Sequence, residues 1–284
     1  WIGGNNNKEV SRQVFFVNWD GEKQQLHITE LPPLPMPLDN LSATYADGCL
    51  YVAGGKGKPQ TVPIGKDGSQ TAPTNPLFSL QLTPSLQKEW VRLPDFPGPA
   101  RVQPVLTAQQ SEDGIRLYLA GGFQPASAHQ EAIVCTDMLS YHSKTKQWRN
   151  EGFLPSLAGG SHRTVTGGCA IASGDSSILL VGGVNYDRFR DALNHPEPDY
   201  LLHPADWYKF NTSLLQYNTF TKHWTHLGNY EELARAGAGI ANNANTVIII
   251  GGELKPGIRT PEVNAFKLII LSRKYSTTQN NNQE

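Results

Sequence analysis

Short apolar runs that end in a pair of glycines recur along the chain. A run such as Leu179-Leu180-Val181 before Gly182-Gly183 is typical of a buried strand that stops at a tight turn. The pairs stand at residues 3–4, 54–55, 121–122, 182–183 and 251–252. Their separations of 51, 67, 61 and 69 residues indicate a structural repeat that carries insertions.

Further apolar segments flank each full copy of the repeat. A segment such as residues 41–46, followed by Asp47-Gly48, predicts the first half of a β-hairpin. After the glycines, a third segment and a turn lead to a tryptophan in three copies, at Trp90, Trp148 and Trp224. The unit is therefore predicted to be a four-stranded antiparallel meander. Such sheets are too small to bury both faces alone and stack around an axis, so the predicted fold is all-β, a kelch-type β-propeller, with a β-sandwich as the alternative.

About five repeats are visible, and both end copies are incomplete. The first lacks an inner strand before Trp1, and the last has no obvious fourth strand after residues 266–270. We expect residues 1–275 to form a single propeller domain whose N-terminal part is missing, and the polar residues 276–284 to form a flexible tail. The longest insertion, residues 186–211, is expected to include a short helix within 199–208 and to project from the binding face.

Composition narrows the classes of partner. The 24 basic and 25 acidic residues are interspersed and give a net charge of -1, so no basic field exists for nucleic acid. No apolar run approaches the ~20 residues of a membrane helix, so no membrane span is expected. Three scattered cysteines are predicted to be small buried hydrophobes. His195 and His203 have no metal-ligand spacing with a third residue, and the sequence predicts neither a metal nor an organic cofactor.

The last copy of the repeat has an unusual sequence, Gly-Gly-Glu-Leu-Lys-Pro-Gly-Ile-Arg-Thr at residues 251–260. It places an acid and two bases directly after a buried strand, which on general grounds is also the pattern of a solvated loop with a salt bridge. The segment resembles the Gly-Glu-x-Lys-Pro-Gly-x-Arg-Thr stretch of the sialate mutarotases, also called N-acetylneuraminate epimerases, which are six-bladed kelch propellers. The resemblance covers roughly residues 90–270. Residues 1–55 resemble that family's last blade and then its first, which predicts a circularly permuted branch.

The resemblance implies roles for two residues of this segment. Glu253 would be the acid/base and Arg259 the residue that holds the anionic sugar. Interconverting the anomers of sialic acid requires removal of the anomeric proton, protonation of the ring oxygen and a clamp on the carboxylate. A carboxylate can shuttle the proton, and guanidinium groups bind carboxylates through two parallel hydrogen bonds.

Other candidate substrate-binding residues follow from the same match. Arg101 is a second candidate for the anion, with a salt bridge at the rim as its alternative. Gln103 and Asn185 are candidates for hydrogen bonds to sugar hydroxyls or, alternatively, for stabilising turns. Lys255 lies inside the matching segment and is included with them.

Two departures from the family pattern concern a histidine and a blade. Cys169 stands about where the family has a histidine, and His162 is the candidate to replace it, with an ordinary loop histidine as the alternative. The blade that precedes the family's last blade is absent from this sequence.

The predicted function is a mutarotase that interconverts α- and β-N-acetylneuraminate by opening and closing the sugar ring. The alternative is a non-catalytic propeller that binds sialic acid or a protein partner. The resemblance also implies a bacterial protein that is periplasmic or otherwise exported, although no signal peptide is present in this sequence. Monomer and homodimer both remain open.

Overall fold

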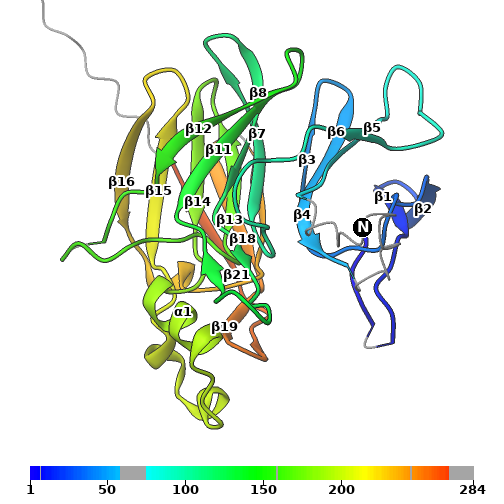
Figure 1. Ribbon diagram of the computed structural model, residues 1–284. Coiled ribbons are helices and arrows are strands. Elements are labelled where there is room, and N and C mark those ends of the chain that lie inside the picture. Colours follow the sequence, from blue (N-terminus) through cyan, green and yellow to red (C-terminus); the bar gives the residue numbers. More distant parts are fainter. Residues whose placement is uncertain (7, 58–74, 158, 244, 269–284) are drawn as a thin grey trace, which may run out of the picture.

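Three antiparallel sheets of four strands follow one another along the chain, with their strands in sequence order. We call them blades II, III and IV (Figure 1). The computed structural model describes residues 1–6, 8–57, 75–157, 159–243 and 245–268. Blade II contains β3 (Asp39–Ala46), β4 (Cys49–Lys56), β5 (Leu77–Gln81) and β6 (Val91–Leu93). Blade III contains β7 (Val105–Ser111), β8 (Gly114–Ala120), β11 (Asp137–His142) and β12 (Gln147–Phe153). Blade IV contains β13 (Cys169–Ser173), β14 (Ser177–Val181), β15 (Ser213–Asn218) and β16 (His223–Asn229). The predicted four-stranded meander is confirmed in all three.

Sheets with fewer described strands lie at the two ends of this series. Blade I is the hairpin of β1 (Val14–Asp20) and β2 (Gln25–Leu31), to which Ile2 adds a single bridge at Val14. Blade V contains β17 (Gly239–Asn243), β18 (Thr246–Ile250) and β21 (Val263–Lys267). The predicted tail at 276–284 lies outside the described residues.

Smaller elements project from blades III, IV and V. Two short hairpins are β9 (Phe123–Gln124) with β10 (Ile133–Val134), and β19 (Glu253–Lys255) with β20 (Ile258–Arg259). The insertion of blade IV holds α1 (Tyr186–Asn194) and the 3-10 turns η1 (Tyr200–Leu202) and η2 (Ala205–Tyr208), and η3 (Glu231–Leu233) precedes blade V. The helix expected within 199–208 is therefore two 3-10 turns, and the α-helix lies earlier in the insertion. No helix in the described part of the chain has the length and apolar character needed to span a membrane.

The first strands of successive blades lie side by side around a common axis. Strand β3 contacts β7, β7 contacts β13, and β13 contacts β17. At one end of these strands, main-chain hydrogen bonds join Gln103 N to Asn40 O, Gly167 N to Gln103 O and Gly237 N to Gly167 O, at 2.8, 2.9 and 2.7 Å. All four residues have left-handed backbone conformations, with φ between 52° and 70°. We call Asn40, Gln103, Gly167 and Gly237 the axial row.

The hydrophobic core is divided into layers between neighbouring blades. One layer joins blades III and IV through residues such as Tyr118 and Tyr217, whose ring centroids are 6.0 Å apart. Trp148 of blade III packs on Phe96, which belongs to the layer between blades II and III, and its Nε1 donates to Pro94 O. The prediction that the tryptophan fills the gap between blades is confirmed.

The glycine pairs are required where these blades approach each other. Gly54 has φ of +68°, and a Cβ there would lie 2.4 Å from the main-chain oxygen of Arg101 in the next connection. Gly182 has φ of +67°, and its Cβ would lie 2.6 Å from Arg235 O. A side chain at either position would separate neighbouring blades, which explains why the repeat ends its second strand in this way.

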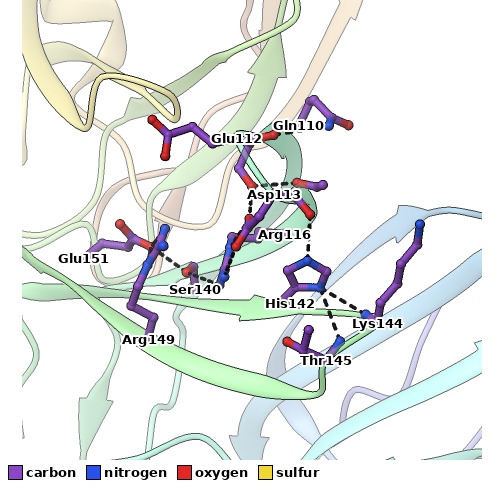
Figure 2. Close-up of polar contacts among 12 residues, drawn as sticks. Gln110, Glu112, Asp113, Arg116, Ser140, His142, Lys144, Thr145, Arg149 and Glu151 are labelled. Carbon is purple, nitrogen blue, oxygen red and sulfur yellow. Dashed lines mark hydrogen bonds and ion pairs between the residues drawn. The ribbon is translucent and has the colours of Figure 1, made fainter.

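A polar network stabilises blade III (Figure 2), and Tyr217 extends it to blade IV. Arg116 donates to Asp113 at 2.6 Å and to Ser140 at 3.2 Å. Ser140 donates to Glu151, and Tyr217 of blade IV donates to the second oxygen of the same carboxylate at 3.0 Å. Because the Glu151 side chain is only 2% exposed, these bonds satisfy a charge that would otherwise be costly to bury.

The cysteines are free thiols. Cys135 and Cys169 are buried, and burial raises the pKa of each thiol to about 11. Cys49 is partly buried. These positions confirm a packing role for Cys135 and Cys169, whose thiols stay protonated at neutral pH.

Candidate functional site

The hairpin of β19 and β20 carries Glu253 and Arg259 at the end of blade V. Gly251 and Gly252, with φ of 60° and 100°, turn the chain out of β18. Main-chain hydrogen bonds of 2.7 and 3.0 Å then join Glu253 to Ala236, the neighbour of Gly237 in the axial row. The hairpin is thereby fixed at the axial end of the molecule.

The two side chains face each other across this hairpin. Glu253 and Arg259 are register partners, and Glu253 Oε1 lies 3.6 Å from Arg259 Nε. The side chains are 32% and 84% exposed. A small anion in solvent can therefore reach the guanidinium while the carboxylate stays beside it.

Gln103 approaches the same site from the axial row. A Cβ placed on Gly167 would lie 3.4 Å from Ala236 Cβ and 3.7 Å from Gln103 Oε1, so only a glycine separates the Gln103 amide from the strand partner of Glu253. Gln103 Nε2 also donates to Asn40 Oδ1 at 3.2 Å. The structure thus brings Gln103 and the Glu253 hairpin to one end of the axis.

Lys255 connects the hairpin to the insertion of blade IV. Its Nζ donates to His203 O at 2.6 Å and to Leu201 O at 3.3 Å. His203 in turn stacks on Trp207, with ring centroids 3.9 Å apart. In this structure the ammonium group is bound to main-chain oxygens, so its evident role is to hold the insertion against the hairpin.

Asn185 and His162 lie at the base of the insertion. Asn185 is the N-cap of α1, and its Oδ1 accepts from Arg188 N at 3.0 Å. His162 is exposed in the connection from blade III to blade IV, and its ring centroid is 5.1 Å from that of Tyr186. Capping engages the Asn185 carbonyl, whereas the His162 ring is open to solvent.

Arg101 is placed differently from the other candidates. Its side chain is 0% exposed, Nη1 donates to Gly121 O, and Nη2 donates to both oxygens of Asp137 at 2.8 Å. This is a buried structural pair rather than a surface anion site. The alternative prediction, a salt bridge at the rim, is therefore right about the ion pair, but the pair is buried within blade III and does not lie at the rim.

Two clefts among the described residues are large enough for a small ligand. One of about 660 Å³ lies between the insertion, the end of blade IV and the β19–β20 hairpin, and its lining includes Asn185, Asn211, Glu231 and Leu254. The other, of about 760 Å³, lies by the β13–β14 turn and contains none of the predicted site residues. The first borders the Glu253 hairpin through Leu254 and includes the predicted site residue Asn185, but Glu253 and Arg259 are not part of its lining.

One cluster has side chains suited to a cation. Ligand atoms of Glu197, Asp199 and His203 lie within 4.8 Å of one another. The turn at η1 brings the histidine to the two acids, which spacing along the sequence did not predict. Two of the three residues are exposed, and such acidic groups are common without a bound ion.

Comparison with known proteins identifies the family. A model of the N-acetylneuraminate epimerase family matches residues 31–281. The chain belongs to the N-acetylneuraminate epimerase family. The resemblance inferred from residues 251–260 is therefore confirmed. The permutation expected for residues 1–55 stays a prediction, because the match begins at residue 31.

Relatives within the N-acetylneuraminate epimerase family are distant in sequence. The N-acetylneuraminate epimerase of Salmonella paratyphi B (strain ATCC BAA-1250 / SPB7) is 27% identical over 248 residues, which cover 82% of this chain and 57% of the relative. That of Pasteurella multocida (strain Pm70) is 26% identical over 215 residues, or 71% and 52%. The chain thus spans little more than half the length of these curated relatives.

A solved structure supports the fold. The structure of YjhT has a TM-score of 0.63 and 23% identity to this chain, and the match covers 85% of this chain and 68% of YjhT. Together with the side-by-side blades, this confirms the kelch-type β-propeller.

The structure also reveals residues that the sequence did not single out. Asn40 shares the left-handed conformation of Gln103 and bonds to its amide. Nothing in the local sequence indicated this role of Asn40, because its partner Gln103 lies 63 positions away.

Proposed function

We propose that the protein is a sugar-acid mutarotase that interconverts the α and β anomers of N-acetylneuraminate. The observation that carries the proposal is the pairing of Glu253 with an exposed Arg259 at the axial end of the propeller. Membership of the N-acetylneuraminate epimerase family supports the sugar acid as substrate. The activity is a proposal for this chain, which spans only part of its relatives.

The chemistry assigns a separate task to each side chain. Arg259 binds the substrate carboxylate, and this binding releases Glu253 from the guanidinium. Glu253 then accepts the proton of the anomeric hydroxyl, and as the bond between the anomeric carbon and the ring oxygen breaks, Glu253 delivers that proton to the ring oxygen. The open keto form rotates, and the reverse steps close the ring on the other face. The reaction is an isomerisation, so all protons are returned.

Gln103 is assigned to orientation of the substrate. Its amide lies on the far side of Gly167 from the Glu253 hairpin, where it can bond to hydroxyl groups of a bound sugar. Binding from both sides of the axis would keep the anomeric carbon beside Glu253 while the keto form rotates.

The test is proton NMR exchange between the two anomers of N-acetylneuraminate. Wild-type protein should accelerate exchange above the buffer rate, and Glu253→Gln and Arg259→Ala should each lower that acceleration by about 100-fold or more. Arg92→Ala is a matched control, because Arg92 forms an exposed ion pair with Asp95 in blade II.

Calorimetry with the same sugar completes the test. Sialate binding without acceleration by the wild type would show a lectin. Absence of both binding and acceleration would favour a protein-binding propeller, and either result contradicts the proposed activity.

A further inference from the structure

The cleft of about 660 Å³ beside the insertion contains an amide that is fixed at one end and open at the other. Asn211 lines the cleft and is 8% exposed. Its Nδ2 donates to the main-chain oxygens of Thr164, Val184 and Gly182 at 2.8, 3.0 and 3.1 Å. Because carbonyl oxygens only accept, these bonds identify the nitrogen and leave Oδ1 at the opposite end. Among the described residues nothing donates to Oδ1, and the atom keeps accessible surface.

Two carboxylates and one ammonium group line the same cleft. Asp206, Lys209 and Glu231 are exposed, and their side chains form no ion pair or hydrogen bond with any described residue. The two acids disfavour a bound anion, and the ammonium group disfavours a bound cation. The charges of the lining therefore suit a neutral molecule whose polar groups both donate and accept hydrogen bonds.

Apolar side chains form another part of the lining. Phe210 is 9% exposed and packs against Tyr208, with ring centroids 6.1 Å apart, and Leu157 and Leu254 also border the cleft. A few polar groups beside apolar walls are the usual composition of a small-molecule site, and the volume lies in the usual range of about 300–1,000 Å³. A sugar ring matches such a lining, because it has hydroxyl groups at its edge and C–H groups on its faces.

We propose that this cleft is a second carbohydrate site, which binds a neutral mono- or disaccharide. Asn211 Oδ1 and the two carboxylates accept hydrogen bonds from the sugar hydroxyls, and Lys209 donates to their oxygens. Asn185 supplies a further donor. Its Oδ1 caps α1 by accepting from Arg188 N, while its Nδ2 has no partner among the described residues.

This site is distinct from the one that the proposed function uses. Both lie at the end of the molecule that carries α1 and β19 (Figure 1). Leu254 of the hairpin lines the cleft, but Glu253 and Arg259 do not. The proposal therefore goes beyond the mutarotase and does not depend on it, because a sugar can occupy the cleft whether or not anomers are interconverted.

Saturation-transfer difference NMR with lactose and maltose tests the cleft in the whole chain. At least one of these neutral sugars should bind the wild type. Replacing both acids, Asp206→Ala with Glu231→Ala, should raise its Kd by about 10-fold or more, the loss expected for hydrogen bonds to charged groups. Ala205→Trp, at an exposed position of the lining, should abolish binding by filling the cleft.

The control is Asp175→Ala, which removes an exposed acid from the other cleft and should leave Kd unchanged. All of these positions are exposed, so the variants should melt at the wild-type temperature. No binding of either sugar by the wild type, or an unchanged Kd in both the double variant and Ala205→Trp, would overturn the site.

The class of ligand is tested through Lys209. Its φ of 51° is a conformation that glycine adopts readily, so Lys209→Gly should keep the fold. With this variant, the Kd of the neutral sugar should rise by a few-fold, which reflects one lost hydrogen bond. Tighter binding of 1,4-diaminobutane than of either sugar by the wild type would show a cation site and overturn the assignment to a neutral sugar.

Competition separates this site from the proposed function. Glu253→Gln and Arg259→Ala should bind the neutral sugar as the wild type does, and excess N-acetylneuraminate should not displace it. Displacement would make the cleft part of the Glu253 site and overturn a second site. Neutral-sugar binding without acceleration of anomer exchange would contradict the mutarotase alone, whereas acceleration without neutral-sugar binding would contradict the second site alone.

Discussion

The Nζ atom of Lys255 lies 2.6 Å from the main-chain oxygen of His203, and this bond joins the hairpin of Glu253 to the insertion 52 residues earlier. The ammonium group of Lys255 therefore links two parts of the candidate site that are remote in sequence. The insertion is held from the other side by Asn194, whose amide exchanges two hydrogen bonds with the main chain of Ala132 in blade III. The insertion of blade IV is thus attached to blade III through Asn194 and to the hairpin after blade V through Lys255.

Replacing Lys255 with methionine should make the insertion less tightly attached to the hairpin. Loss of two charge-assisted bonds should lower the free energy of unfolding by about 1–3 kcal/mol and speed limited proteolysis within the insertion. Lys255→Arg should restore most of the protection. A higher KM with unchanged proteolysis and stability would instead support direct contact between Lys255 and the substrate.

Arg101→Met should destabilise the fold, because it leaves the Asp137 carboxylate unpaired next to the core. The expected loss in urea unfolding is about 3–5 kcal/mol. Arg92→Met removes an exposed ion pair of similar geometry and should cost less than about 1 kcal/mol. If Arg101 were a substrate contact, its replacement would weaken ligand binding and leave the unfolding midpoint in place.

Gly54→Ala should cost more than the same substitution at Gly98. Both residues have positive φ, 68° and 84°, but a Cβ at Gly54 would lie 2.4 Å from Arg101 O while one at Gly98 would meet nothing within 4 Å. Gly98→Ala should therefore lose only the left-handed backbone term of about 1–2 kcal/mol. Gly54→Ala should lose that and the cost of separating blades II and III, so equal unfolding midpoints would contradict the close approach.

Glu151 should make the stability of the fold depend on pH in the acidic range. Burial acts to raise the pKa of this carboxyl, but hydrogen bonds from Ser140, Arg149 and Tyr217 outweigh it, so its pKa lies below the ordinary value of 4.5. A depressed native pKa stabilises the fold above the unfolded value, and that stabilisation is lost as pH falls from about 5 through the native pKa.

Urea unfolding at pH 7 and at pH 3.5 measures this dependence. Glu151→Gln should be less stable than wild type at pH 7 and should lose less between the two pH values. Glu112→Gln, at an exposed position of the same blade, should keep the wild-type difference. An unchanged pH difference in Glu151→Gln would exclude this carboxyl as a source of acid sensitivity.

The features that the sequence predicted well depend on local contacts or on repetition. Glycine pairs and tryptophans recur in register, so their packing between blades could be inferred from one copy and extended to the rest. Glu253 and Arg259 are six residues apart, and a tight hairpin alone is enough to make them partners. Such short-range contacts can be inferred directly from the order of the residues.

The features that it missed depend on contacts made across the whole fold. Arg101 and Arg163 are both arginines in connections between blades, yet one meets Asp137 and the other meets no acid among the described side chains. Lys255 carries the positive charge expected of an anion-binding residue, but its ammonium group donates hydrogen bonds to main-chain oxygens of a distant insertion. Which partner a charged side chain finds is decided only when the blades are assembled.

The axial row has a consequence for how a ligand is oriented. Its four positions repeat the same left-handed backbone, but Asn40 and Gln103 carry amides, whereas Gly167 and Gly237 carry no side chain. Within this row, the positions at the start of blades II and III therefore offer hydrogen-bonding groups, whereas the positions at the start of blades IV and V offer none. The blades repeat the same backbone around the axis, but the side chains at equivalent positions of the axial row differ. A small asymmetric molecule at this end of the axis therefore meets amide groups on one side and glycines on the other.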